Sequence, residues 1–238
     1  MSVEWLKLFR DLSREKRLPV HMHFAQSKRE VDKVEKRTGL TPVRLLSSLG
    51  LLSPHLLAAH CLYVDDEEKR LLASSGTMVV QCPSTYMLAG EPFHALDILK
   101  AGGRVLVGTD APCYSDGIDM FREIRNLVFA VRLLRRSSSP LTAVQALELA
   151  TRGVAEALGL DGLGKIGVGR EADIVLLKPR LPRLRPVADP HSSVVYSATV
   201  GDVDTVVIAG RVVVKGGKSM LVGEEDVVRE DCLGRLST

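Results

Sequence analysis

Short apolar segments alternate with longer charged segments along the first half of the chain. The longer segments have the spacing of apolar and charged positions that is typical of amphipathic helices. The short segments are Leu18–Phe24, Leu56–His60, Thr77–Gln81 and Arg104–Asp110. Strands that alternate with helices form parallel βαβ units, and continuously apolar strands are buried on both faces. The pattern therefore predicts a parallel sheet that is covered by helices.

Helices are predicted between and after these strands. Acidic residues favour a helix start at Glu67, and the pair Gly102-Gly103 favours a helix end. The segment before Arg17 is also helical in pattern and lacks the apolar region of a signal peptide. The predicted helices are Lys28–Arg37, Glu67–Ser74, Pro92–Ala101, Asp119–Arg135 and Leu141–Leu158.

The pattern changes after Gly159, where glycines, prolines and short β-branched runs replace the long helical segments. The runs Ala172–Leu177, Val203–Ala209 and Arg211–Lys215 are predicted strands, and Ala209-Gly210 is the expected turn of a hairpin. We therefore predict an α/β protein with two domains, residues 1–159 and 160–238, of which the second is all-β.

The composition is that of a globular protein, with 45% hydrophobic and 26% charged residues in a chain of 238. The net charge is +3, and because 29 acidic residues are interspersed with 32 basic ones, no nucleic-acid partner is expected. No apolar stretch approaches the roughly 20 residues of a membrane span. The four cysteines form no C-x-x-C pair, which favours reduced thiols and a cytoplasmic protein.

Each of the four predicted strands ends in a polar residue: His23, His60, Gln81 and Asp110. Catalytic groups of (β/α) barrels lie at the carboxyl ends of the strands. Imidazole and carboxylate groups that converge there suit Zn²⁺. His21 faces the same side as His23 and is a candidate for an additional ligand. A single histidine is more often a packed, hydrogen-bonded core residue than a ligand, but the joint placement at strand ends favours a metal site.

Seven blocks of sequence carry these residues and the segments that follow them. The blocks are Val20–Ser27, Ala58–Cys61, Val80–Ser84, Val107–Asp110, Asp119–Arg125, Gly164–Val175 and Val206–Val213. In this order they resemble the metal-dependent amidohydrolase superfamily, and within it the branch of methylthioadenosine/S-adenosylhomocysteine deaminases, guanine deaminases and triazine chlorohydrolases. The resemblance implies the C-terminal half of a TIM-like (β/α)8 barrel, strands five to eight, followed by part of a small β-sandwich.

The resemblance also implies roles for individual residues. His23 and Asp110 would bind Zn²⁺ or another divalent metal such as Fe²⁺, and His60 would polarise the substrate or be a further ligand. Asp110 would accept a proton from the attacking water, and ammonia would leave a cyclic amidine-like carbon. Gln26 and Gln81 are expected, together with His60, to contact the substrate.

Three departures from the family pattern change this interpretation. Gln26 stands where the branch carries a proton-shuttling glutamate, and an amide cannot protonate a leaving group. Gln81 stands where the seventh strand carries a histidine. The first-strand H-x-H pair is absent, because His21-Met22-His23 corresponds to strand five. A complete barrel takes about 250 residues. We therefore expect strands one to four to lie in a missing N-terminal segment or on a partner, such as a second copy of the chain.

Three functions are compatible with these observations. The leading prediction is a metal-dependent hydrolase that acts on a non-peptide C–N bond of a small heterocycle, namely a deaminase of an aminopurine or a related compound. The first alternative is a non-catalytic or truncated half-barrel that needs a partner or an upstream segment. The second alternative is a chlorohydrolase-like reaction, in which a better leaving group needs no acid at Gln26.

Overall fold

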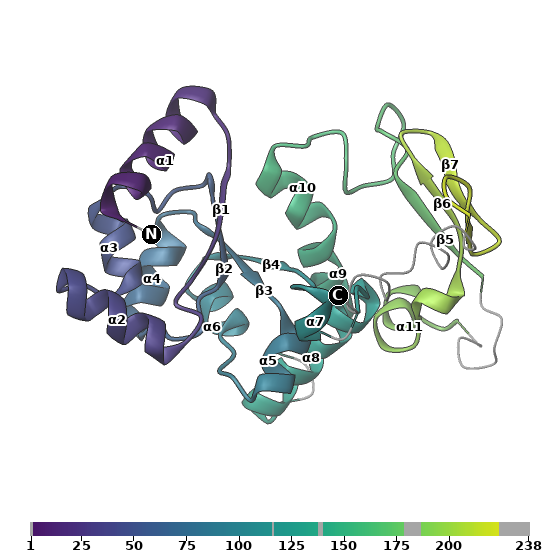
Figure 1. Ribbon diagram of the computed structural model, residues 1–238. Helices are drawn as coiled ribbons and strands as arrows, with labels where there is room; N and C mark the ends of the chain where they lie inside the picture. The colour runs from purple at the N-terminus through teal and green to yellow at the C-terminus, as the bar shows by residue number, and fades with distance from the viewer. Residues whose placement is uncertain (1, 116, 138–139, 179–186, 224–238) are drawn as a thin grey trace, which may run out of the picture. The chain divides into compact units, whose positions relative to one another are not determined.

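The chain divides into two units, Met1–Leu160 and Asp161–Thr238. The computed structural model describes residues 2–115, 117–137, 140–178 and 187–223. One of the four cysteines, Cys232, lies outside this described part. Each unit has one four-stranded sheet of its own (Figure 1).

The first unit is built around a parallel sheet, which confirms the predicted α/β class. Its strands are β1 (Val20–Phe24), β2 (Leu56–His60), β3 (Met78–Gln81) and β4 (Arg104–Val107), and they lie in sequence order across the sheet. All four fall within the predicted segments. The strand β4 ends before Asp110, however, so Asp110 lies in the loop that follows the strand.

Helices connect and cover these strands. Side-chain caps fix several of their starts: Ser27 begins α2, Asp119 begins α8, and Asp65 forms a reciprocal capping box with Glu68 at α4. In the described residues, no helix is long and apolar enough to cross a membrane. The helices are α1 (Val3–Lys16), α2 (Lys28–Thr38), α3 (Pro42–Ser48), α4 (Asp66–Ser74), α5 (Pro83–Ala89), α6 (Ala95–Lys100), α7 (Pro112–Ser115), α8 (Met120–Arg135), α9 (Ala143–Ala150) and α10 (Arg152–Leu158).

The prediction of one helix over Leu141–Leu158 was wrong, because the chain breaks at Thr151 into α9 and α10. The Thr151 hydroxyl donates to the Leu147 carbonyl at 2.7 Å, which competes with the helical hydrogen bond at that position. The backbone at Gly153 also approaches the Glu148 carbonyl so closely that a Cβ atom would lie 2.8 Å from it. The short helices α3 and α5 were not predicted, although each has a proline in its first turn.

The parallel sheet is buried at its centre and more exposed at its edge strand β1. Ala58, Val79 and Val105 are paired across three strands and are at most 2% exposed. On the next register row, His23 of β1 is exposed. Helices α2, α3 and α4 lie together on one side of the sheet (Figure 1). Among the described residues, β1 pairs only with β2, so its other edge is open.

The second unit has an antiparallel sheet of β5 (Ile174–Leu177), β6 (Val203–Ile208), β7 (Arg211–Lys215) and β8 (Lys218–Ser219). The predicted hairpin around Ala209-Gly210 is confirmed, because it joins β6 to β7. The prediction of an all-β unit was wrong. Helix α11 (Pro190–Tyr196) begins at Asp189, whose carboxylate accepts from the backbone amides of His191 and Ser192, and a short 3₁₀ helix covers Val200–Asp202.

Candidate metal centre

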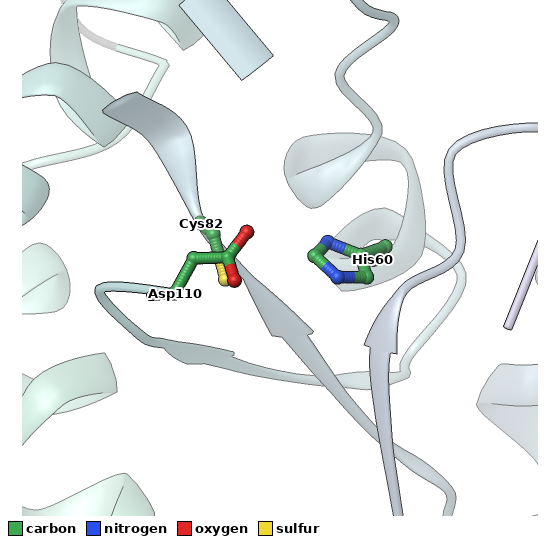
Figure 2. A group of neighbouring side chains, drawn as sticks. All are labelled: His60, Cys82 and Asp110. Atoms are coloured by element: carbon green, nitrogen blue, oxygen red, sulfur yellow. The ribbon is translucent and has the colours of Figure 1, made fainter. Parts of the chain in front are cut away.

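Three side chains converge at the carboxyl end of the parallel sheet. His60 is the last residue of β2, Cys82 follows β3, and Asp110 lies in the loop after β4. One ligand atom from each of the three lies within 4.8 Å of the other two. Figure 2 shows the Asp110 carboxylate facing the His60 ring, with the Cys82 sulfur beside the carboxylate. Parallel strands bring these residues together because their carboxyl ends meet at one edge of the sheet.

The backbone at these strand ends is in the left-handed region. The φ angles are +79° at His60, +50° at Cys61, +59° at Asp110 and +50° at Ala25. This region costs non-glycine residues on the order of 1 kcal/mol each, and histidine and aspartate adopt it more readily than most. Hydrogen bonds hold the turn at β2, because the Gln81 side-chain amide donates to the His60 carbonyl at 2.6 Å. The strain thus lies where the polar side chains leave the sheet.

His60 is only 1% exposed. Its Nδ1 lies 3.3 Å from the Tyr86 hydroxyl, whereas its buried Nε2 has no hydrogen-bond partner among the described residues. Burial lowers the pKa of His60, nearby His23 and His21 lower it further, and the negative charge of Asp110 opposes them. The ring is therefore neutral near pH 7, which is the form that binds metal ions.

Only one of the two oxygens of the Asp110 carboxylate has a hydrogen-bond partner among the described residues. Its Oδ1 accepts from the backbone amide of Ala111 at 2.8 Å, whereas its buried Oδ2 has no partner among the described residues. Buried polar atoms are almost always hydrogen-bonded, so two unpartnered ones at a single place call for a ligand. Imidazole nitrogen, carboxylate oxygen and thiolate sulfur are the donors that Zn²⁺ prefers. The residues at this place therefore fit a divalent metal such as zinc.

Cys82 is the member of this group that the sequence analysis missed. Its side chain is 4% exposed and packs with Leu62 and Tyr86. Burial, and then the charge of Asp110, raise the pKa of its thiol to about 12. The signal in the sequence was the position of Cys82 at the carboxyl end of a strand, near which the other candidate residues also lie.

Contacts from α8 fix the segment that carries Cys82. Glu123 is fully buried, and its Oε2 accepts from the backbone amide of Ser84 at 2.9 Å. The Asn126 side-chain amide donates to the Ser84 hydroxyl at 3.0 Å. Since Ser84 lies two residues after Cys82, these two contacts hold the start of α5 against α8 and so restrict the position of the thiol.

The two histidines of β1 lie beside this group but outside it. The His23 ring meets the His60 ring edge-on, with 4.8 Å between the centroids, and the His21 ring centroid is 6.3 Å from that of His23. Both side chains are exposed. Partial loss of hydration, and then the nearby His23, lower the pKa of His21. The metal-binding roles of His23 and His21 stay predictions.

The two glutamines differ in position. Gln26 lies half-buried in the loop after β1, where its backbone amide donates to Glu30 at 3.0 Å. Gln81 is fully buried and holds the His60 carbonyl, which gives it a positioning contact within the sheet. The substrate contacts of both glutamines stay predictions.

Comparison with known proteins gives a consistent result. The sequence model described as "Amidohydrolase family" matches residues 1–213. The chain is 35% identical to a 5-methylthioadenosine/S-adenosylhomocysteine deaminase of Pyrococcus furiosus, over 95% of this chain and 54% of that protein. It is also 35% identical to a 5'-deoxyadenosine deaminase of Methanothermobacter thermautotrophicus, over 95% of this chain and 53% of that protein.

Solved structures share the fold. An adenosine deaminase from Xanthomonas campestris with bound zinc superposes with a TM-score of 0.90 at 28% identity, over 94% of this chain and 52% of that one. Atrazine chlorohydrolase TrzN from Arthrobacter aurescens, complexed with zinc, gives a TM-score of 0.87 at 25% identity, over 95% of this chain and 51% of that one. The chain thus spans about half the length of the proteins that it matches.

Proposed function

Because the chain belongs to the amidohydrolase family, we propose that it carries the metal-binding half of a hydrolase that removes an amino group from an aminopurine or a related cyclic amidine. The single observation that carries this proposal is the pair of buried, unpartnered atoms, His60 Nε2 and Asp110 Oδ2, in side chains that face each other at the strand ends. Two such atoms are costly to bury unless a ligand binds them.

The ligand that best fits is Zn²⁺ or another divalent metal such as Fe²⁺, which would supply a water activated near neutral pH. His60 and Asp110 would hold it, with His23 as a further ligand and His21 as an additional one. Asp110 keeps one oxygen on its backbone partner, Ala111, and would use the other to accept a proton. Tyr86 would hold the His60 ring in place through its contact with Nδ1.

The substrate class follows from the relatives, whose names are those of deaminases of adenine nucleosides. Gln26 and Gln81 would contact the heterocycle together with His60. The amide of Gln26 cannot act as a proton donor, which leaves a chlorohydrolase-like displacement as the alternative chemistry. One structural neighbour is named for such a reaction.

The fold supports a more specific assignment. We propose that β1 to β4 correspond to strands five to eight of a (β/α)8 barrel, so that residues 1–159 form the hydrolase part. The antiparallel sheet within residues 160–238 would be part of a small β-sandwich. This domain arrangement and a cytoplasmic location remain proposals.

The open edge of the first unit bears on the partner. Four strands are about half of what a closed barrel needs, and β1 has no neighbour on its outer side among the described residues. Along α1, Trp5, Leu8, Phe9 and Leu12 are spaced as one helical face and are 37–56% exposed. An apolar face beside an open strand edge favours association. We propose that a second copy or an N-terminal segment covers both; if neither does, a non-catalytic half-barrel is the alternative.

The test is ammonia release from methylthioadenosine, S-adenosylhomocysteine and 5'-deoxyadenosine by the zinc-loaded chain. We expect release above the background of an Asp110→Asn variant, and Gln26→Glu should raise it by about 10²–10⁴-fold, the usual contribution of a general acid. Sedimentation in the same buffer reports whether the active species is an assembly. If Gln26→Glu lowers ammonia release but chloride release from a chlorotriazine occurs, the chlorohydrolase alternative is favoured instead.

A further inference from the structure

The sulfur of Cys82 lies beside the Asp110 carboxylate, which faces the His60 ring (Figure 2). All three ligand atoms lie within 4.8 Å of one another, and Cys82 is 4% exposed. Gly108 lies close beside the sulfur, because a Cβ atom added there would be 3.6 Å from the Cys82 Sγ. The sulfur thus lies among Leu62, Tyr86 of α5 and Gly108, which follows β4.

A second observation points independently to a ligand at this place. His60 is 1% exposed, yet its Nε2 has no hydrogen-bond partner among the described residues. The Tyr86 hydroxyl contacts the opposite nitrogen, Nδ1, and so leaves Nε2 as the ring atom available to a metal. The carboxylate Oδ2 of Asp110 is likewise buried and without a partner in the described part of the chain.

We propose that Cys82 is a metal ligand, and that His60, Cys82 and Asp110 together form a three-ligand site for a thiophilic divalent cation such as Zn²⁺ or Cd²⁺. This inference deepens the proposed function, on which it rests for the catalytic use of the metal. It adds a sulfur donor to the set of histidines and aspartate expected from the sequence. Three protein ligands with an open fourth position are the arrangement of catalytic zinc sites.

Binding of the cation to Cys82 is an exchange of one proton for one metal ion. The cation displaces the thiol proton to solvent, the S–H bond is replaced by a sulfur–metal bond, and no oxidant or reductant takes part. Zinc lies about 2.0–2.3 Å from nitrogen, oxygen and sulfur ligands, so ligand atoms in a tetrahedral site are about 3.5 Å apart. The ligand atoms lie within 4.8 Å of one another, so each pair needs to approach by at most about 1.3 Å to reach that geometry.

The competing explanation is that Cys82 is only a packed core thiol, next to Leu62 and Tyr86. Both explanations allow a substitution at Cys82 to weaken folding. They differ in one spectroscopic property, because only a ligated thiolate gives a sulfur-to-metal charge-transfer absorption with Cd²⁺ or Co²⁺. A sulfur ligand also makes the site prefer Cd²⁺ and Zn²⁺ to Mg²⁺ and Ca²⁺, which bind oxygen ligands.

The experiment titrates the full 238-residue chain with Cd²⁺ in a Cys113→Ser/Cys232→Ser background, which keeps only Cys61 and Cys82 as thiols. We expect a charge-transfer band that saturates at one equivalent of Cd²⁺ per chain. Cys82→Ser should abolish the band and weaken Cd²⁺ binding by about 100-fold or more, whereas Cys61→Ser, which changes the other buried thiol, should retain it. His60→Ala should also weaken binding, and a large excess of Mg²⁺ should not compete.

Far-ultraviolet circular dichroism of each variant separates loss of a ligand from loss of the fold. Retention of the band in folded Cys82→Ser would overturn the inference, and so would absence of the band in the folded parent protein. Should Cys82→Ser fail to fold, Co²⁺ in the parent protein decides the question, since a tetrahedral spectrum with a thiolate charge-transfer band supports sulfur ligation and a spectrum without one rejects it. The ammonia assay is separate: a band without ammonia release contradicts the proposed function alone, and ammonia release without a band contradicts this inference alone.

Discussion

The two sheets of this chain differ in how deeply they are buried. In the parallel sheet, Ala58 and Val79 are completely buried. In the antiparallel sheet, Val175, Leu176 and Ile208 are 51–53% exposed. The candidate metal ligands belong to the parallel sheet, where burial removes water from His60 and strengthens its electrostatic interactions. The difference teaches that a deeply buried sheet can hold strained, unpartnered polar groups that a shallow sheet would leave to solvent.

Backbone strain follows the same division. In the first unit, left-handed residues stand at three strand ends, among them His60 and Asp110 of the metal centre. In the described part of the second unit, the only non-glycine residue with positive φ is Ala209, in the hairpin turn. Backbone strain at the strand ends of the first unit sets the directions of the metal-binding side chains, because the surrounding core holds the strained residues in place. Strain at Ala209 only closes a turn.

The sharpest test of the burial difference is a matched pair of valine substitutions. Val79→Ala in β3 removes two buried methyl groups and leaves a cavity, which should lower the free energy of unfolding by about 2–3 kcal/mol. Val212→Ala in β7 changes a side chain that is 48% exposed and should cost about 0.5–1 kcal/mol. Urea denaturation followed by circular dichroism measures both, and equal losses would contradict the contrast between the sheets.

A buried carboxylate gives the next largest effect. Glu123 is fully buried, and Glu123→Ala leaves the Ser84 amide without its acceptor, which should cost about 1–3 kcal/mol. Burial raises the pKa of Glu123 above its ordinary value, despite its hydrogen bonds with Ser84. The folded state therefore binds this proton more tightly than the unfolded state does, so stability is highest below the ordinary carboxyl pKa and falls as pH rises through the folded-state pKa.

Glu123→Gln is the matched control, because the amide keeps an acceptor for Ser84 and carries no charge. Relative to this variant, the parent protein should lose stability as the pH rises above the ordinary carboxyl pKa of 4.5, until the raised folded-state pKa is passed. The readout is the difference in unfolding free energy at each pH. A difference that grows in favour of the parent protein as pH rises would show that the Glu123 charge is not penalised.

The sequence predicts the frame of the first unit well. Strands β2, β3 and β4 are mainly aliphatic, and β1 alternates apolar residues with histidines, patterns that local sequence alone identifies. The position of His60 at the end of β2 follows from the same pattern, because the strand ends where His60 interrupts the apolar run. The break at Thr151 was not predictable in this way, because it depends on a side-chain hydrogen bond that competes with the helix.

The geometry of the metal centre is harder to predict from the sequence than the strands are. The left-handed turns at His60 and Asp110 decide where those side chains point, and neither residue type signals such a turn by itself. Cys82 was not among the predicted ligands, because it was considered only as part of the block Val80–Ser84, although its sulfur lies within the ligand group. The exposure of His23 depends on what lies beyond the open edge of β1, which is long-range information that no local pattern contains.

The smallest predicted effect is the difference between asparagine substitutions at two alanines that have nearly the same φ angle. Ala209 has φ +48° and is followed by Gly210 at φ +77°, the angles of a type I′ turn, in which asparagine is favoured at the first position. Ala209→Asn should therefore raise the free energy of unfolding by about 0.5–1 kcal/mol. Ala25 has φ +50° but is completely buried at the end of β1, so Ala25→Asn should lower stability despite the same backbone preference. Urea midpoints of the two variants provide the measurement. Stabilisation by both would mean that backbone strain outweighs burial at the strand ends of the first unit, and destabilisation by both would mean that the hairpin turn is not limited by its alanine.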